Sequence, residues 1–361
     1  MQHEPVETKG VIGGFDCHSE VHVGAALDPL GRLLGTASFP ATPNGYHRAT
    51  EWLRSFGPII AVGVESTGSF GAALARVLSA QGLRVIEINQ PHRHTRSRRG
   101  KTDAIDAEAA ARKVLSGEAT GAPKDTRGVV EAIRQLTVAR EGAVKARTAA
   151  LCQLGDLLVT APAAVREQLA VRKSLESKAT LCARLRPARG AARGDLLDPS
   201  AAAKIALRSV ARRITNLTKE AAVLAEQLDR LVAFAAPRTL RQLGLGTQNT
   251  AALLVAAGEN IGRFNSEASF AHLCAAAPVS ASSGHTSRHR LNHGGNRQAN
   301  RALHMTVIVR LRYCPRTRAY MERRVGEGRT KQEVIRCLKR YVVRDVYRTL
   351  RADLSDLALR E

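Results

Sequence analysis

The chain has 361 residues, 44% of them hydrophobic, which is enough for two or three compact domains and excludes a chain disordered throughout. Its 55 Lys and Arg outnumber its 32 Asp and Glu and give a formal charge of +23, which favours polyanionic partners, nucleic acid first. The six cysteines form no C-x-x-C pair and no apolar run reaches the roughly 20 residues of a membrane span, which argues against a disulfide framework, a zinc ribbon and any membrane partner.

The N-terminal segment is polar and carries Glu4 and Glu7, unlike a signal sequence. With scattered cysteines that fit a reducing compartment, this predicts a soluble cytoplasmic protein. Aromatic residues make up only 4% of the chain, which argues against base stacking as the main binding device and favours contacts to backbone phosphates.

Residues 1–125 are predicted to form an α/β unit with a mixed sheet. Three short strands come first, followed by helix, strand, helix, strand and helix. The expected strands are Val11–Phe15, Val21–Leu27, Leu33–Phe39, Ile59–Val64 and Arg84–Ile88, and the expected helices are Asn44–Phe56, Phe70–Ala80 and Asp103–Leu115. The first 91 residues are slightly acidic, unlike the rest of the chain.

Four carboxylates in this unit stand at the ends of predicted elements: Asp16, Glu65, Asp103 and Asp106. Residues three apart share a helix face, so the last two can converge beside the strand ends. Such a cluster repels itself unless cations bind it, and two Mg²⁺ ions held by carboxylates are a usual device of phosphoryl transfer. The alternative is structural, with Asp103 as a helix N-cap and Asp106 as a first-turn acid.

A basic run precedes the pair of aspartates. It contains Arg93, Arg96, Arg98, Arg99 and Lys101. We expect these side chains to bind phosphate and to bring it to the metal ions, although a solvated loop would have the same composition.

Residues 126–236 are predicted to be a helical hairpin or coiled coil. Apolar residues alternate spacings of three and four from Leu207 to Leu231, as in a heptad seam, and a weaker seam runs over 129–158. The Gly-, Pro- and Arg-rich segment 186–200 reads as the tip. The seam fits either an intramolecular helix pair or a coil between subunits.

The predicted third unit, residues 237–361, contains a densely basic stretch, with 19 Lys or Arg against five acids over residues 263–351. Leu243–Gly246 reads as a glycine turn before a helix, and Thr317–Arg351 as one helix with a basic outer face. A serine-glycine segment, P-V-S-A-S-S-G at 278–284, could expose Ser283 as a nucleophile, but such loops ordinarily carry no chemistry. The arginines expected to contact nucleic acid here are Arg288, Arg290, Arg297 and Arg301.

Four motifs read together resemble the IS110-family transposases over nearly the whole chain. They are V-I-G-G-F-D at 11–16, V-G-V-E-S-T-G at 62–68, K-T-D-A-I-D-A at 101–107, and P-x₄-S-G at 278–284 with a G-N and an arginine following by 301. The arginine-rich insert at 186–194 and Gly244-Leu245-Gly246 depart from the usual pattern.

The resemblance implies a RuvC-like, RNase H-fold Asp-Glu-Asp-Asp domain, a helical middle and a mainly helical C-terminal transposase domain. Asp16, Glu65, Asp103 and Asp106 fall where the family binds metal, here Mg²⁺, and Ser283 matches the proposed nucleophile, with Ser282 next to it. The implied activity is DNA recombination that mobilises an insertion sequence, in some members with a structured guide RNA from the element.

Two other functions remain open from the residues alone. One is a metal-dependent nuclease of the Holliday-junction type, in which water replaces the serine. The other is a nonenzymatic scaffold that binds nucleic acid. The heptad seam also makes a homo-oligomer, a dimer or a tetramer, a reasonable expectation.

Overall fold

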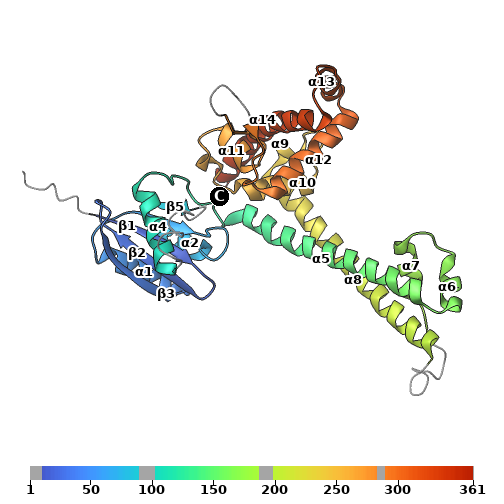
Figure 1. Ribbon diagram of the computed structural model, residues 1–361. Helices are drawn as coiled ribbons and strands as arrows, with labels where there is room; N and C mark the ends of the chain where they lie inside the picture. The colour runs from blue at the N-terminus through green and yellow to red at the C-terminus, as the bar shows by residue number, and fades with distance from the viewer. Residues whose placement is uncertain (1–9, 89–101, 187–197, 283–288, 361) are drawn as a thin grey trace, which may run out of the picture.

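The computed structural model describes residues 10–88, 102–186, 198–282 and 289–360. A sheet-containing unit and a helical C-terminal unit lie close together, and a long helical hairpin extends away from both of them (Figure 1). Of the helices that these ranges contain, none is both long enough and apolar enough to cross a membrane.

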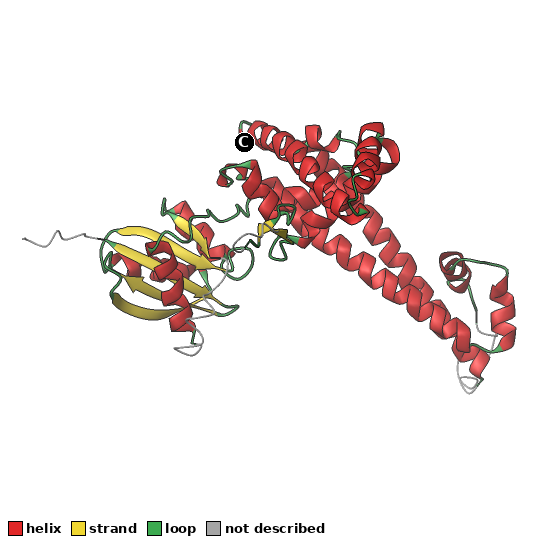
Figure 2. Cartoon of the chain, turned by 45° about the horizontal axis from the view of Figure 1, so that its top comes forward, coloured by secondary structure: helices red, strands yellow, loops and turns green. Residues whose placement is uncertain are grey.

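The first unit contains a five-stranded mixed sheet, as predicted (Figure 2). Its strands are β1 (Val11–Cys17), β2 (Val21–Leu27), β3 (Leu33–Pro40), β4 (Ile59–Glu65) and β5 (Val85–Ile88). The order is β3-β2-β1-β4-β5, with the first three antiparallel and β4 and β5 parallel to β1. This architecture is consistent with a RuvC-like fold.

Helices cover both faces of the sheet. The helices α1 (Pro43–Arg54) and α2 (Ala72–Ala80) pack on one face, where Phe15, Leu53 and Leu74 are fully buried. The helix α4 (Asp103–Leu115) lies on the opposite face, against Ile12 and Leu27. Strand alternation explains the division, because successive residues of β1 point to opposite faces.

The hairpin consists of two long antiparallel helices, α5 (Gly128–Thr160) and α8 (Pro199–Ala235). Two short helices, α6 (Ala163–Ala170) and α7 (Leu175–Cys182), pack at its far end (Figure 1). Leu207, Val210 and Ile214 of the heptad seam are buried in one cluster with residues of α5. These seam residues therefore pack the two helices of one chain against each other. Most of the predicted tip, 187–197, lies outside the described residues.

The C-terminal unit is mainly helical. Its elements are α9 (Pro237–Leu240), α10 (Thr247–Ala257), the 3₁₀ helix η2 (Ile261–Arg263), α11 (Glu267–Leu273), β6 (Val279–Ser280), β7 (His289–Arg290), α12 (Arg297–Tyr313), α13 (Pro315–Gly326) and α14 (Lys331–Ala358). Ile133 and Leu228, from the base of the hairpin, are buried in the same core as Leu253 of α10 and Val343 of α14.

The single helix predicted over 317–351 is wrong, because the chain turns between α13 and α14. Gly328 has a φ of 86°, a conformation that favours glycine and ends the helix. Thr330 then begins α14 with a capping box, in which its side chain and that of Glu333 each accept a backbone N–H. The predicted apolar face survives, since Val334, Leu338, Val342 and Val346 are all buried.

Candidate active site

Two glycines in the sheet allow α4 to lie unusually close to it. A Cβ on Gly14 of β1 would come within 2.3 Å of the Ala111 nitrogen and 2.4 Å of the Ala107 oxygen. Gly63 of β4 faces the same helix, and a Cβ on Gly63 would lie 3.0 Å from the Ala110 oxygen. Ile12, near the start of β1, packs against the last turns of α4, and Gly14 faces the middle of that helix. The helix therefore runs antiparallel to β1, and its first turn lies at the carboxyl end of the strand.

The first turn of α4 is capped by Thr102. The Thr102 hydroxyl accepts the backbone N–H of Ile105 at 3.3 Å, and the Thr102 backbone is extended, as an N-cap requires. The interpretation of Asp103 as the N-cap is therefore wrong. Asp103 and Asp106 occupy the first turn, and the Asp103 carboxylate is available for another role.

Asp16, His18 and Asp103 form a group that could hold a metal ion. The His18 Nε2 atom lies 3.2 Å from an Asp16 oxygen and 3.4 Å from an Asp103 oxygen. One ligand atom from each of the three side chains lies within 4.8 Å of the other two. Asp16 is nearly buried, whereas Asp103 and His18 are about half exposed, so the group opens to solvent on one side.

The electrostatics of Asp16 favour a bound cation. Burial raises the pKa of Asp16, the imidazole of His18 opposes the rise, and the carboxylates of Asp106 and Asp103 add to it. A cation between these groups would offset both the lost hydration and the mutual repulsion. Two carboxylates and one imidazole are ligands that Mg²⁺ or Mn²⁺ can accept, with Mg²⁺ preferring the oxygens.

The group of three does not include Glu65 or Asp106, the other two predicted metal ligands. Phe15 of β1 is opposite Val64 of β4, so Asp16 and Glu65 follow at the carboxyl ends of neighbouring parallel strands. Burial raises the pKa of the Cys17 thiol, and the carboxylates of Asp16 and Glu65 raise it further, which places both charges near one sulfur. Asp106 is almost fully buried.

His18 belongs to the candidate metal group, although the sequence alone does not predict it there. It follows β1, two positions after Asp16, and therefore projects to the same side if the extended backbone continues. That spacing was the available signal, but a histidine two residues beyond an aspartate is common, and only its approach to Asp103 distinguishes it.

The serine-glycine segment is part of a small hairpin in the C-terminal unit. β6 pairs antiparallel with β7, with Ser280 opposite His289. Ser282 is the last described residue after β6. Three of the predicted arginines line one cavity of about 1070 Å³ beside this hairpin: Arg290 from β7, and Arg297 and Arg301 from α12.

Two family models match the chain in N-to-C order. A transposase model, the DEDD domain of IS110 transposases, matches residues 13–161, and the model for the transposase IS116/IS110/IS902 family matches residues 238–322. The chain belongs to the IS110 family of transposases. No curated protein matches it.

The two matched segments of this IS110-family transposase hold the two predicted halves of the site. The first contains all four carboxylates together with the whole of α5, and the second contains the β6–β7 hairpin and α12. Several predicted residues lie outside the described ranges, and their placement is not tested: Arg93, Arg96, Arg98, Arg99, Lys101, Ser283 and Arg288.

Proposed function

We propose that this transposase recombines DNA through a metal-assisted serine nucleophile, with Mg²⁺ held by the carboxylates of the first unit and Ser283 as the attacking group. The observation that carries the proposal is the meeting of Asp16 and Asp103 around His18, at the carboxyl end of β1. Membership of the family supports recombination of DNA as the reaction class.

In the proposed site, Asp16 and Asp103 would hold the metal directly, and Glu65 and Asp106 would complete its surroundings. When bound, the metal would polarise the scissile phosphate and offset the charge that develops there. His18, which lies between two carboxylates, would orient them before the metal binds. The strand end and the capped helix turn are rigid elements, and they fix the distance between the ligands.

The serine would come from the C-terminal unit. Its hydroxyl oxygen would attack phosphorus and form a phosphoserine link, while the bond from phosphorus to one strand end breaks and that end leaves as a hydroxyl. Arg290, Arg297 and Arg301, on the elements next to the serine segment, would bind the flanking phosphates. Ser282 remains the neighbouring alternative to Ser283.

A structured guide RNA and a homo-oligomer, dimeric or tetrameric, belong to the same proposal. The net charge of +23 supports an extended polyanion as a partner. In RNA-guided recognition the protein contacts the backbone and base pairing supplies the sequence. Val138 of α5 and Val223 of α8, both exposed on the hairpin, support contact with another subunit.

The decisive experiment is to search for an SDS-resistant protein–DNA adduct in cells that carry the native flanking DNA. We expect the adduct with the wild type, and its loss with Ser283→Ala and with Asp16→Asn. Ser209→Ala and Asp156→Asn, exposed positions on the hairpin, are the matched controls and should keep it. If Ser282→Ala abolishes the adduct and Ser283→Ala does not, Ser282 is the nucleophile.

Two outcomes would replace the proposal. Cleavage of DNA that needs Asp16 but forms no adduct would favour the nuclease that uses water. Full activity of Asp16→Asn would favour a scaffold in which the carboxylates are structural. A separate test concerns the guide RNA. If the purified protein carries one, ribonuclease treatment should abolish recombination and leave the binding of nonspecific duplex DNA unchanged.

A further inference from the structure

The C-terminal unit contains a strongly cationic cavity that extends well beyond the serine segment. It is lined mainly by residues of the β6–β7 hairpin and of the helices α12, α13 and α14. These three helices contact one another (Figure 1). Eight arginines and one lysine line it, against one carboxylate, that of Glu333. With a volume of about 1070 Å³, it reaches the upper end of the range for small-molecule sites.

About half of these cations have no acidic partner among the described residues. Arg340 and Arg344 both pair with Glu267, Arg324 pairs with Glu327, and Arg329 pairs with Glu333. The cations without such a pair are Arg290, Arg297, Arg301, Arg336 and Lys339. They come from a strand and two helices, so the fold gathers positive charge that the acidic residues of the described ranges do not neutralise.

Lys339 indicates that the cavity suits an anion. It is half-buried, and its ammonium group donates one hydrogen bond, to the Asn300 side chain at 3.1 Å. Burial lowers the pKa of Lys339, and the charge of Arg336 lowers it further. An anion bound beside both side chains would relieve that repulsion and replace the lost hydration.

The same cavity contains two aromatic rings. Tyr320 of α13 and Tyr341 of α14 meet edge to face, with ring centroids 5.5 Å apart. Tyr341 is 48% exposed, and the Arg344 guanidinium lies 5.7 Å from its centroid. In a chain with so few aromatic residues, an exposed ring among unpaired cations is the combination found where single-stranded nucleic acid binds.

We propose that this cavity binds an unpaired stretch of nucleic acid, with its phosphates on the five cations without acidic partners and one base stacked on Tyr341. A duplex keeps its bases stacked inside, so only an unpaired base can reach a ring that lines a cavity. An acidic peptide would satisfy the cations but not the ring. The proposal concerns binding alone, and it does not depend on the chemistry proposed for Ser283 or the carboxylates.

The test measures affinity by fluorescence anisotropy with the full chain in metal-free buffer. The probes are a 12-nucleotide oligo(dT), the matching oligo(U) and a 12-base-pair DNA duplex. We expect Tyr341→Ala to weaken binding of the single strands roughly ten-fold, the loss of one stacked base, and to leave duplex affinity unchanged. Tyr341→Phe should restore binding because it keeps the ring. The tighter of the two single strands identifies DNA or RNA as the source.

Two matched controls accompany these variants. Tyr313→Ala removes an exposed tyrosine from the end of α12, outside the cavity, and should bind as the wild type does. Arg336→Gln should reduce the dependence of log affinity on log salt by about 0.7, the value for one single-strand phosphate contact. Arg351→Gln, on the same helix but outside the cavity, should have a smaller effect. Circular dichroism checks that each variant is folded.

Cys337 offers an independent readout, because it is exposed and lines the cavity. Oligo(dT) should slow its alkylation by iodoacetamide and leave Cys152, an exposed cysteine on the hairpin, unaffected. Normal single-strand affinity of Tyr341→Ala would overturn the proposal. So would an equal loss for single strands and duplex, or alkylation of Cys337 at the same rate with and without oligonucleotide.

Discussion

Arg263 of the C-terminal unit forms an ion pair with Glu87 of the sheet, with a nitrogen-to-oxygen distance of 3.6 Å. The Arg263 guanidinium also donates to the carbonyl oxygens of Ala256 and Ala257 and lies over the ring of Phe264. Glu87 in turn accepts the hydroxyl of Thr67 at 2.7 Å, two residues beyond Glu65. A continuous set of contacts thus joins the C-terminal unit to the loop that follows a candidate metal ligand.

We expect Arg263→Ala to lower the free energy of unfolding by about 2 kcal/mol, because two carbonyl groups and one carboxylate lose a charged donor. Trp52, the only tryptophan, packs between Phe39 and Phe56 in the first unit, so its fluorescence reports that unit in urea titrations. Ellipticity at 222 nm reports mainly the helical remainder. In the variant, the two transitions should separate.

The control is Arg127→Ala, which removes an exposed ion pair with Asp125 in the nearby linker. It should cost less than about 1 kcal/mol. If Arg263→Ala behaves like this control and the two transitions still coincide, the pair does not join the units energetically. A double-mutant cycle with Glu87→Gln isolates the pair from the carbonyl contacts.

Gly14 is predicted to be intolerant of a side chain. Gly14→Ala would place a methyl group 2.3 Å from the α4 backbone and push the helix off the sheet, at a cost of about 3 kcal/mol. The same substitution at Gly142, an exposed position inside α5 with open space around it, should instead stabilise by up to about 1 kcal/mol. Equal effects of the two substitutions on urea midpoints would contradict this account of the helix approach.

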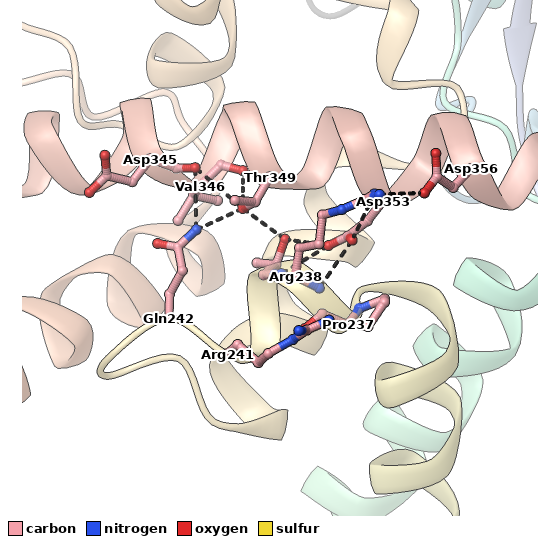
Figure 3. A network of polar contacts seen from close by, with 10 residues as sticks. Pro237, Arg238, Arg241, Gln242, Asp345, Val346, Thr349, Asp353 and Asp356 are labelled. Carbon is pink, nitrogen blue, oxygen red and sulfur yellow. Dashed lines mark hydrogen bonds and ion pairs between the residues drawn. The ribbon is translucent and has the colours of Figure 1, made fainter.

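Asp353 joins α14 to the start of α9 (Figure 3). Its side chain is fully buried and accepts the backbone N–H groups of Arg238 and Thr239, at 3.1 and 2.9 Å, and the Thr239 hydroxyl at 2.8 Å. Asp353→Ala would leave the two backbone N–H groups without this acceptor, while the Thr239 hydroxyl would keep its hydrogen bond to the Thr349 hydroxyl, and the loss should cost about 3 kcal/mol. Asp356→Ala removes only a partly exposed ion pair with Arg238 and should cost no more than about 1 kcal/mol in the same thermal melts.

The sheet and its helices could be predicted from the sequence because local patterns determine them. Apolar runs such as Ile59–Val64 are bounded by turns, and Thr102 precedes a helix rich in alanine. The break after α13 was missed because apolar residues continue at helical spacing on both sides, and the only signal was Gly326-Glu327-Gly328.

The candidate site was predictable only in part. The four carboxylates could be identified by their positions at element ends, but the role of His18 depends on how closely α4 approaches β1, a tertiary distance. The cavity could not be predicted at all. Arg290 of β7 is far in sequence from Lys339 and Tyr341 of α14, and only the tertiary packing of the C-terminal unit brings the three side chains to one cavity.

His22 should make the stability of the protein depend on pH. It is buried and stacked on Tyr46, with ring centroids 5.5 Å apart. Burial lowers the pKa of His22 from 6.5, and the nearby His18 adds to this effect. The unfolded chain therefore binds a proton at a higher pH than the folded chain does, and stability falls as the pH drops below 6.5.

The loss from this one group can reach about 1.4 kcal/mol for each pH unit below 6.5, until the folded imidazole is protonated as well. His22→Phe keeps the stacked ring but cannot titrate. The difference in unfolding free energy between wild type and His22→Phe should be constant above pH 7 and should grow in favour of the variant toward pH 5. A constant difference across that range would show that His22 does not titrate on unfolding.

Asp16 should make the first unit sensitive to divalent cations. Without metal, Asp16→Asn should raise the melting temperature at pH 7.5, because it removes a buried charge that Asp103 and Asp106 repel. With Mn²⁺ at 100 times its dissociation constant, the wild type should gain about 2.7 kcal/mol and overtake the variant, which lacks one ligand. Asp156→Asn, an exposed carboxylate on α5, should follow the wild type under both conditions.

The diagnostic result is that Mn²⁺ reverses which protein is more stable, the wild type or Asp16→Asn, because a purely structural aspartate would not produce this reversal. If Asp16 were a helix or turn cap, Asp16→Asn would change the stability little, because Asn caps about as well as Asp, and Mn²⁺ would shift both proteins equally. Trp52 fluorescence confines the measurement to the first unit, so cations bound elsewhere do not enter it. His18→Gln should give an intermediate shift, because the two carboxylates of the group remain after the imidazole is removed.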